Sequence, residues 1–534
     1  MITGNTLWPD TIGGDLILEN IDGAPRHIFR GAPSDFYEML LFTCAKHPDK
    51  VFIVNENGRK YTFSDILRLT DDFAGYLYNK IGIRHGAKVS VMLYNGVEFC
   101  VAFMAIIKIG AICIPLPTKY RKAEISSMVK RCHPSAVICE DVFSSWFDEY
   151  IAAVPNTTVV FSENSIYDYG FSGLEPCGMA PYGGHAQDPV IIMYTSGTTS
   201  QSKGVIIRNY SAVHAVLCYK RIFSLTEKDS SLISIPIYHV TGLIALFGVF
   251  LCCGGTLYLH RYFNAERMLK DTYDGGITFW HASPTVYSLL MQHQAEYHSL
   301  PTLRTIACGG GYLLKAKIEQ LHNWLPHTAI RTVYGLTETS SPATIFPCDV
   351  SSDPHIGSSG IPIPGLSVRI TDDDGNELPD RSVGEICMKG TVVLESYFQL
   401  NIDKIKDGWL KSGDLGYLDG NYLFVVDRKT DMINRGGEKI WSSDVENELL
   451  RIPGIISCAV VGIPDDIYGE VAAALVQLVP GAKLTEDSIR QNLRKRMAQF
   501  KVPAKICFTD EIPLTENSKV DKKYIRELLQ KNSK

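Results

Sequence analysis

Hydroxyl and glycine residues are concentrated in one short stretch of the chain, Tyr194 to Val205. Its twelve residues include six serines or threonines, two glycines and one lysine, Lys203. Glycines let a backbone approach a ligand closely, hydroxyls donate hydrogen bonds, and a lysine adds a point charge. Apolar runs at 190–193 and 205–207 flank the stretch. The pattern predicts a loop between two short buried strands that holds a polyphosphate.

Two other interpretations fit this stretch less well. A flexible Ser/Thr/Gly linker would not be clamped by apolar runs on both sides. A Walker A loop, G-x-x-x-x-G-K-[ST], needs glycine before its lysine and Ser or Thr after it. Here Ser202 precedes Lys203 and Gly204 follows it, so the match fails at both neighbours of the lysine.

The segment 331–339 offers a hydroxyl and a carboxylate after a tight turn. Gly335 opens the turn, Thr337 carries the hydroxyl and Glu338 the carboxylate. A carboxylate beside a triphosphate is suited to bind Mg²⁺. Thr-Glu in a loop is also a common helix cap, so the residues alone leave both interpretations open.

Three later segments carry charged side chains in polar surroundings. Asp414 follows a tight turn and suits two hydrogen bonds from a ribose diol, or one to its own backbone. The pair Asp427-Arg428 follows a strand-like segment, and the simpler interpretation is a surface ion pair. Lys519 lies in a polar loop between apolar segments, where most lysines are simply solvated.

Composition is that of an ordinary soluble globular protein. The chain has 534 residues, enough for two to four domains, with 45% hydrophobic and 21% charged residues. A net charge of −6 gives no reason to expect nucleic acid or an anionic membrane as a partner. The 14 cysteines form no C-x-x-C pair, and the N-terminus lacks the features of a signal peptide. We therefore expect buried free thiols in a reducing compartment, the cytoplasm.

One uncharged segment, Gly242 to Leu259, reaches the lower length limit for a membrane span. After Gly242 it contains three further glycines, Gly248, Gly254 and Gly255, and it ends in a strand-like run. These features favour a buried helix, a Gly-Gly turn and a buried strand, with a membrane span as the alternative.

Helical and strand-like segments alternate along the first part of the chain. The first helix begins near 61–65, with Thr62 or Ser64 as its N-cap. We expect two further helices, near 96–107 and 121–131, and strands at 88–93, 111–115, 135–139, 231–235, 278–280 and 305–308. This alternation predicts parallel sheets covered on both faces, with ligands bound beyond the carboxyl ends of the strands.

The character of the sequence changes from about Pro362. A strand, a turn on Asp374-Gly375, a second strand to Leu378 and a third at 384–389 predict a small antiparallel β subdomain. After Arg428 an α+β pattern continues for the length of a small domain. We expect an α/β fold: an N-terminal domain (1–428) with two parallel-type α/β sheets to about 361 and the β subdomain at about 362–428, then a small mobile α+β domain (429–534).

In their order and spacing, five segments resemble the motifs of the adenylate-forming superfamily, which comprises acyl-CoA synthetases, peptide-synthetase adenylation domains and luciferases. The segments are 194–205, 334–338, 412–414, Asp427-Arg428 and Lys519. The resemblance extends from Tyr61 to Asp521, and the chain is most like the acyl- or aryl-CoA ligases. It implies a ligase that uses ATP and Mg²⁺ to convert a carboxylic acid to an acyl-adenylate, releases pyrophosphate, and transfers the acyl group to coenzyme A.

The resemblance also implies roles for individual residues. The ATP phosphates would be bound by Thr195, Ser196, Gly197, Thr198, Thr199 and Lys203. Adenine would lie along Gly309, Gly310, Gly311 and Tyr312, and the nucleotide site would also include Tyr334 and Gly335. The ribose would be held by Asp414 and Arg428. Thr337 would bind the α-phosphate and Glu338 the Mg²⁺. Lys519 would bridge the reacting carboxylate and the α-phosphate, and His239 completes the set of expected catalytic residues.

In such enzymes the C-terminal domain rotates between the two half-reactions. By resemblance, rotation would remove Lys519 and bring the loop Arg435 to Glu438, with Gly436 and Gly437, beside the pantetheine. The sequence departs from the usual pattern at the hinge, where Thr430 replaces Asp or Lys, and before the catalytic lysine, where Ser518 replaces glycine. Further departures are Ser442 for a common proline and Val333 for a common glycine.

The acid is expected to be larger than propionate, either medium-chain or aryl, and not an α-amino acid. The segment 236–242 resembles the family's gate to the acyl pocket and holds Tyr238-His239, with no acidic residue before Glu266 to pair an ammonium. Gly335 stands where acetate-type members carry a bulky aromatic residue, which implies an open pocket. The expected lining residues are His239, Thr241, Trp280, Gly309, Gly310 and Gly335. For His239 and Trp280, ordinary core packing is an equal alternative.

The acyl acceptor is expected to be free coenzyme A, because the chain ends soon after Lys519 without a fused carrier domain. The alternatives are a ligase that loads a separate acyl carrier protein, a luciferase-like monooxygenase, and a non-catalytic nucleotide-binding protein. The presence of Lys519, Glu338 and Asp414 argues against the last. We expect a monomer or homodimer without a membrane span.

Overall fold

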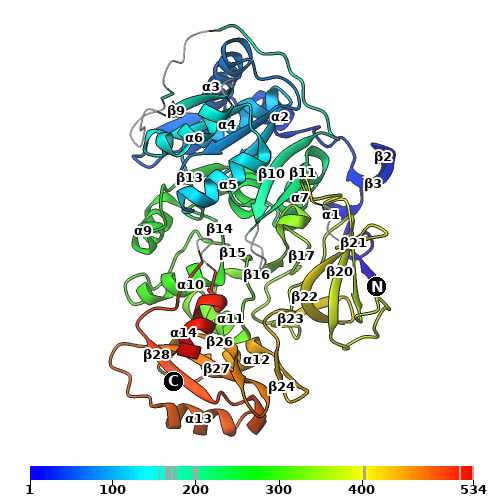
Figure 1. Cartoon of the computed structure of the whole chain (residues 1–534). Coiled ribbons are helices and arrows are strands. Elements are labelled where there is room, and N and C mark those ends of the chain that lie inside the picture. Colours follow the sequence, from blue (N-terminus) through cyan, green and yellow to red (C-terminus); the bar gives the residue numbers. More distant parts are fainter. Residues whose placement is uncertain are drawn as a thin grey trace.

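The computed structural model describes residues 1–154, 157–162, 170–171, 177–195, 202–400, 404–515 and 519–531. Its α/β layers occupy the upper and central parts of Figure 1, an antiparallel sheet lies beside them, and the C-terminal sheet lies below. The expected fold class, a large mixed α/β region followed by a smaller α+β region, is confirmed.

The first large sheet has the strand order β11-β10-β7-β6-β8-β9. Its strands are β6 (Lys88–Met92), β7 (Ile112–Pro115), β8 (Ala136–Glu140), β9 (Thr158–Ser162), β10 (Pro189–Thr195) and β11 (Lys203–Arg208). All are parallel except β11, which forms an antiparallel hairpin with β10. Parallel neighbours need crossover helices, here α4 (Val97–Lys108) and α5 (Lys122–Cys132). Each of the predicted elements of this region is present.

Helix α3 (Phe63–Tyr76) shows how local sequence sets an element boundary. The hydroxyl of Thr62 accepts the Asp65 N–H at 3.1 Å, and the Asp65 carboxylate accepts the Thr62 N–H at 2.9 Å. This reciprocal capping box satisfies two backbone donors that the first turn leaves free. Of the two predicted caps, Thr62 is the one used.

The second parallel-type sheet consists of two adjoining pieces. One has the order β12 (Ser230–Ile233), β13 (Thr256–Leu259), β4 (Val51–Val54), β5 (Lys60–Thr62). The other has the order β14 (Phe279–Ala282), β15 (Thr305–Cys308), β16 (Ala329–Tyr334), β17 (Thr344–Ile345), β18 (Ile361–Pro362). The Thr278 N–H donates to Ser230 O at 3.0 Å and Ser231 Oγ to Phe279 O at 2.7 Å, so β12 and β14 lie edge to edge.

The uncharged segment Gly242 to Leu259 is part of the apolar core. It folds as a π-helix (Thr241–Gly248), α8 (Val249–Cys253), a turn at Gly254-Gly255 and β13, as predicted. Among the described residues, no helix has the length and apolar character needed to cross a membrane.

Further helices of the N-terminal region are α1 (Asp10–Gly13), α2 (Phe36–Lys46), α6 (Asp148–Ala153), α7 (Asn209–Ile222), α9 (Ala265–Gly275), α10 (Pro284–Leu290) and α11 (Lys315–Trp324). Between α1 and α2 the chain forms a hairpin of β2 (Leu16–Ile21) and β3 (Ala24–Phe29). The cysteines are free and most are buried, as expected.

The antiparallel subdomain has the order β1-β19-β20-β22-β21, with β23 paired to β22. Its strands are β1 (Ile2–Thr3), β19 (Leu366–Thr371), β20 (Gly384–Gly390), β21 (Ile405–Lys406), β22 (Trp409–Asp419) and β23 (Tyr422–Arg428). The strand predicted after Asp374-Gly375 is wrong: that segment makes only an isolated bridge from Thr371 to Glu377. The contribution of β1 was not predicted, because its partner lies hundreds of residues away.

The C-terminal region is an α+β unit with its own apolar cores. Its elements are β24 (Ile433–Arg435), β25 (Glu438–Ile440), α12 (Ser442–Leu450), β26 (Ile455–Asp465), β27 (Gly469–Leu478), α13 (Glu486–Arg494), β28 (Lys505–Thr509) and α14 (Lys522–Lys531). It packs on α11, where Asn447 Oδ1 accepts the Ala316 N–H at 3.2 Å and Lys317 Nζ donates to Ile456 O at 2.9 Å. These contacts fix how the C-terminal region faces the carboxyl ends of β15 and β16.

Candidate active site

The carboxyl ends of two adjacent parallel strands open into the glycine-rich loop and the threonine-glutamate turn. Strand β15 ends before Gly309, and Gly310 has a φ of 77°, a conformation that favours glycine. Strand β16 ends at Tyr334, and a short 3₁₀ turn (Thr337–Thr339) follows. Both segments therefore lie where ligands bind in α/β sheets.

Asp414 and Arg428 lie opposite each other on β22 and β23. The Tyr334 hydroxyl donates to Asp414 Oδ2 at 2.9 Å, and Arg428 Nε lies 3.7 Å from Asp414 Oδ1. Burial raises the pKa of Asp414, and the charges of Arg428 and Lys519 together with the Tyr334 hydrogen bond oppose that rise. Three segments distant in sequence thus converge on one carboxylate.

Lys519 reaches this group from the C-terminal region. The Thr515 N–H donates to Lys519 O at 2.6 Å, and Leu514 pairs with Val520, so a hairpin-like loop carries the lysine. Its Cε lies 4.0 Å from the position a Cβ on Gly310 would take. Desolvation, and then the charge of Arg428, lowers the pKa of Lys519 to about 8, against the opposing charges of Asp414 and Glu338. The residue as a whole has an exposed surface, so solvent screens part of the lowering of the Lys519 pKa.

Glu338 is held by a residue that the sequence did not single out, Tyr397. The Tyr397 hydroxyl donates to Glu338 Oε1 at 3.0 Å, and the Leu394 N–H donates to Glu338 O at 2.8 Å. Within the described part of the chain, Oε2 of Glu338 enters no hydrogen bond or ion pair. One carboxylate oxygen is thus oriented and the other is available, an arrangement that fits a hard cation such as Mg²⁺.

The predicted phosphate loop begins and ends on the β10–β11 hairpin. Thr195 and Lys203 are register partners at its end, and Arg131 donates to Ser202 O at 2.7 Å. The loop is therefore clamped between buried strands, as predicted. Four of the predicted phosphate ligands, Ser196, Gly197, Thr198 and Thr199, lie outside the described residues, as does Ser518.

Family models match most of the chain. A model described as AMP-binding enzyme matches residues 41–398, and one described as AMP-binding enzyme C-terminal domain matches residues 444–519. The chain belongs to the AMP-binding enzyme family.

Relatives of this AMP-binding enzyme are similar over nearly their whole length. Indoleacetate–CoA ligase of Aromatoleum aromaticum is 30% identical over 88% of this chain and 94% of its own. 2-Succinylbenzoate–CoA ligase of Bacillus licheniformis is 30% identical over 89% and 96%. The crystal structure of ATP-bound MatB from Rhodopseudomonas palustris superposes with a TM-score of 0.85 at 26% identity, covering 94% of this chain and 100% of that one.

Strand β14 directs His281 toward the glycine loop, whereas Trp280 shows the core packing that was the alternative expected for it. Trp280 is 1% exposed, packs in the core against Tyr287 and donates from Nε1 to Thr272 Oγ1 at 3.0 Å. Side chains alternate along a strand, so His281 faces the other way. Its Nε2 lies 3.1 Å from the position a Cβ on Gly309 would take. Burial lowers the pKa of His281 to about 3, so its imidazole is neutral, and Nδ1 has no hydrogen-bond partner among the described residues.

Other predicted acyl-pocket residues lie on the loop after β12 and the turn after β16. His239 is half-buried with its ring 4.6 Å from that of Tyr238, and Thr241 begins the π-helix. At Gly335 a Cβ would collide with the carbonyl oxygen of Ser341. The turn back from β16 to β17 therefore requires this glycine for backbone reasons, whatever its effect on a pocket.

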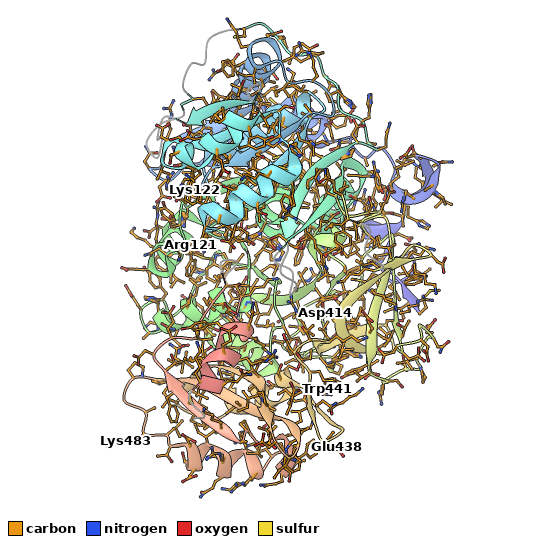
Figure 2. All side chains as sticks on the ribbon, in the orientation of Figure 1. Arg121, Lys122, Asp414, Glu438, Trp441 and Lys483 are labelled. Carbon is orange, nitrogen blue, oxygen red and sulfur yellow. The ribbon has the colours of Figure 1, made fainter. Side chains whose placement is uncertain are left out.

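The predicted pantetheine loop is not part of the group around Asp414. Gly436 donates to Tyr468 O at 2.8 Å and Gly437 to Asn434 Oδ1 at 3.1 Å, both within the C-terminal region. Glu438 lies on that region apart from Asp414 (Figure 2). Thr430 is exposed in the turn after β23, where the Asp431 N–H donates to Arg428 O at 3.0 Å. Of the two groups expected from the C-terminal region, the structure brings only Lys519 to the site.

Proposed function

We propose that this enzyme activates a carboxylic acid with ATP and transfers the acyl group to coenzyme A. The carboxylate attacks the α-phosphorus of ATP, forming the acyl-adenylate and releasing pyrophosphate. The thiol of coenzyme A then attacks the acyl carbonyl, forming the thioester and releasing AMP. The relatives' names, each a ligase that joins an acid to coenzyme A, support this reaction.

One observation carries the proposal: Lys519 lies against Gly310 within electrostatic reach of Asp414 and Glu338. Attack of a carboxylate on a phosphate brings two anions together, so catalysis consists mainly of positioning and charge neutralisation. An ammonium at this point would stabilise the negative charge that develops between them. We assign this role to Lys519.

The remaining groups would bind the nucleotide. Asp414 and Arg428 would hold the ribose, Gly309 to Tyr312 would lie along adenine, and Thr337 would bind the α-phosphate. Thr195 and Lys203, at the ends of the phosphate loop, would orient the triphosphate. Glu338 would hold Mg²⁺, which supplies charge neutralisation at the phosphates.

The second half-reaction requires a different group at the same place. We propose that the C-terminal domain (429–534) turns about Thr430, withdrawing Lys519 and bringing Gly436-Gly437 to the pantetheine. The exposed turn that holds Thr430, immediately after β23, supports a hinge there.

The acid is proposed to be larger than propionate and to carry a ring or a polar group on its tail. His281 supports this assignment, because a buried neutral imidazole whose Nδ1 finds no partner in the described part of the chain is costly unless a ligand satisfies it. The relatives act, by name, on indoleacetate and 2-succinylbenzoate.

Pyrophosphate exchange into ATP with a panel of carboxylic acids tests the proposal. We expect exchange with one group of aryl or medium-chain acids, and none with acetate or α-amino acids. Addition of coenzyme A should then yield the thioester. Lack of exchange with every acid would disprove adenylation, and thioester formation only on an acyl carrier protein would disprove the assigned acceptor.

A further inference from the structure

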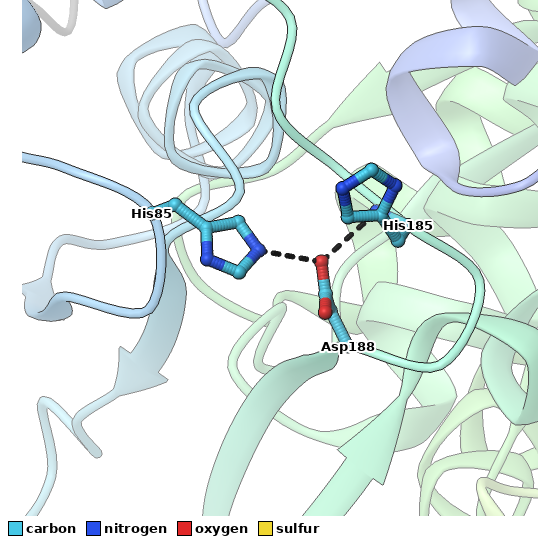
Figure 3. A group of neighbouring side chains, drawn as sticks. All are labelled: His85, His185 and Asp188. Atoms are coloured by element: carbon cyan, nitrogen blue, oxygen red, sulfur yellow. Dashed lines mark hydrogen bonds and ion pairs between the residues drawn. The ribbon is translucent and has the colours of Figure 1, made fainter. Parts of the chain in front are cut away.

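Two histidines and an aspartate lie together at the beginning of β6 and β10, away from the groups assigned to catalysis (Figure 3). His85 Nε2 lies 2.8 Å from Asp188 Oδ2, and one ligand atom from each of His85, His185 and Asp188 lies within 4.8 Å of the other two. The phosphate loop follows the opposite end of β10. The cluster is therefore separated from that loop by the full length of the strand.

The loop that carries two of these residues is held in place by side chains that hydrogen-bond to its backbone or pack against it. Asp188 Oδ2 accepts the His185 N–H at 3.0 Å, and Asn209 Nδ2 donates to His185 O at 2.9 Å. A side chain on Gly184 would collide with the Asp35 carboxylate at the start of α2. The loop thus packs so closely that glycine is needed, and its course is set without any ligand.

His85 is positioned from the other side. The Gly86 N–H donates to Gly110 O at 2.8 Å, and a Cβ on Gly110 would collide with the His85 ring and the Gly183 carbonyl oxygen. The side chain of His85 is 52% exposed and that of Asp188 15% exposed. The imidazole can therefore adjust its rotamer over a carboxylate whose place is fixed.

We propose that His85, His185 and Asp188 bind a divalent transition-metal ion of the Zn²⁺ class. Two imidazoles and one carboxylate are nitrogen and oxygen ligands that suit Zn²⁺, whereas Mg²⁺ prefers oxygen alone. Three protein ligands leave a fourth position for water. The ion would replace the hydrogen bond between His85 and Asp188 and would join the segment before β6 to the segment before β10.

The test is equilibrium dialysis of the reduced, nucleotide-free protein against Zn²⁺, followed by metal analysis. The unmodified protein should bind one equivalent more than either His85→Ala or His185→Ala. A control variant at an exposed histidine elsewhere, His298→Ala, should bind as much as the unmodified protein. Zn²⁺ at a hundredfold excess over its Kd should raise Tm by about 2 °C, and only where both histidines are present.

Co²⁺ substitution identifies the ligands independently. The cluster contains no cysteine, so its Co²⁺ form should show d–d absorption without a thiolate charge-transfer band. Equal Zn²⁺ stoichiometry in all four proteins would overturn the proposal, as would a thiolate band that accounts for all bound Co²⁺. Melting curves without metal verify that His85→Ala, which loses one side-chain hydrogen bond, is folded.

Discussion

The hydroxyl of Tyr334 donates a hydrogen bond of 2.9 Å to the buried carboxylate of Asp414, and so joins the end of β16 to the antiparallel subdomain. Hydrogen bonds to charged groups contribute about 1.5–3 kcal/mol. We therefore expect Tyr334→Phe to raise the KM for ATP about tenfold and to leave the KM for the acid unchanged. Tyr417→Phe, on the same strand as Asp414, is the control. An equal change in both KM values would show that Tyr334 acts through general stability instead.

Lys519→Ala should separate the two half-reactions. Loss of its positive charge should slow pyrophosphate exchange on the order of 10²–10³-fold, as loss of other preorganised charge-stabilising groups does. Thioester formation from a preformed acyl-adenylate should be largely kept. Lys523→Ala, an exposed lysine four residues further on, should leave both rates unchanged. If Lys519→Ala slowed both half-reactions equally, rotation of the C-terminal domain would not be needed.

The lowered pKa of Lys519 gives adenylation an alkaline limit. The active form is the ammonium, which is present below a pKa of about 8 and is lost as the pH rises through it. We expect kcat/KM for ATP to fall above pH 8, with solvent screening moving the midpoint upward. The arginine in Lys519→Arg stays charged to a much higher pH, so any residual activity of this variant should not decrease above pH 8. If kcat/KM for ATP decreased above pH 8 in Lys519→Arg as it does in the unmodified protein, the titrating group would be another residue.

His281 should influence which acid is used. His281→Ala should lower kcat/KM for acids with a polar tail about tenfold more than for apolar acids of equal size, because only the former gain a hydrogen bond. The KM for ATP should not change. Trp280→Phe, on the opposite face of β14, should lower Tm without altering this ratio. If His281→Ala lowered kcat/KM equally for both kinds of acid, the proposed contact between His281 and the acid would be wrong.

Gly335→Ala should destabilise the protein rather than narrow a pocket. The added Cβ would collide with the Ser341 carbonyl, and relief requires movement of the β16–β17 turn. We expect a loss on the order of 3 kcal/mol, measured by denaturant unfolding, with both half-reactions impaired. Gly13→Ala, where the nearest atom would be 3.8 Å away, should cost far less. A stable Gly335→Ala variant with altered acid preference would favour the pocket explanation.

Sequence reasoning succeeded where the determinants are local. The apolar runs around the phosphate loop and the N-cap residue Thr62 act over a few positions, so β10, β11 and the start of α3 were predicted. The sequence could not show whether Trp280 or His281 faces the glycine loop, because β14 is buried on both faces and its residues do not alternate between polar and apolar. Tyr397 gave no signal at all, since its partner Glu338 lies 59 residues away.

Strand β1 pairs Ile2 with Val368 and Thr3 with Ser367. Residues 2 and 3 leave the ribosome long before their partners, since translation proceeds from the N-terminus. This edge of the antiparallel sheet can therefore close only after more than three hundred further residues have been synthesised. During that interval β1 has no strand partner, and a peptide fused before Ile2 would delay or block closure of the sheet even though it is remote in sequence from every catalytic group.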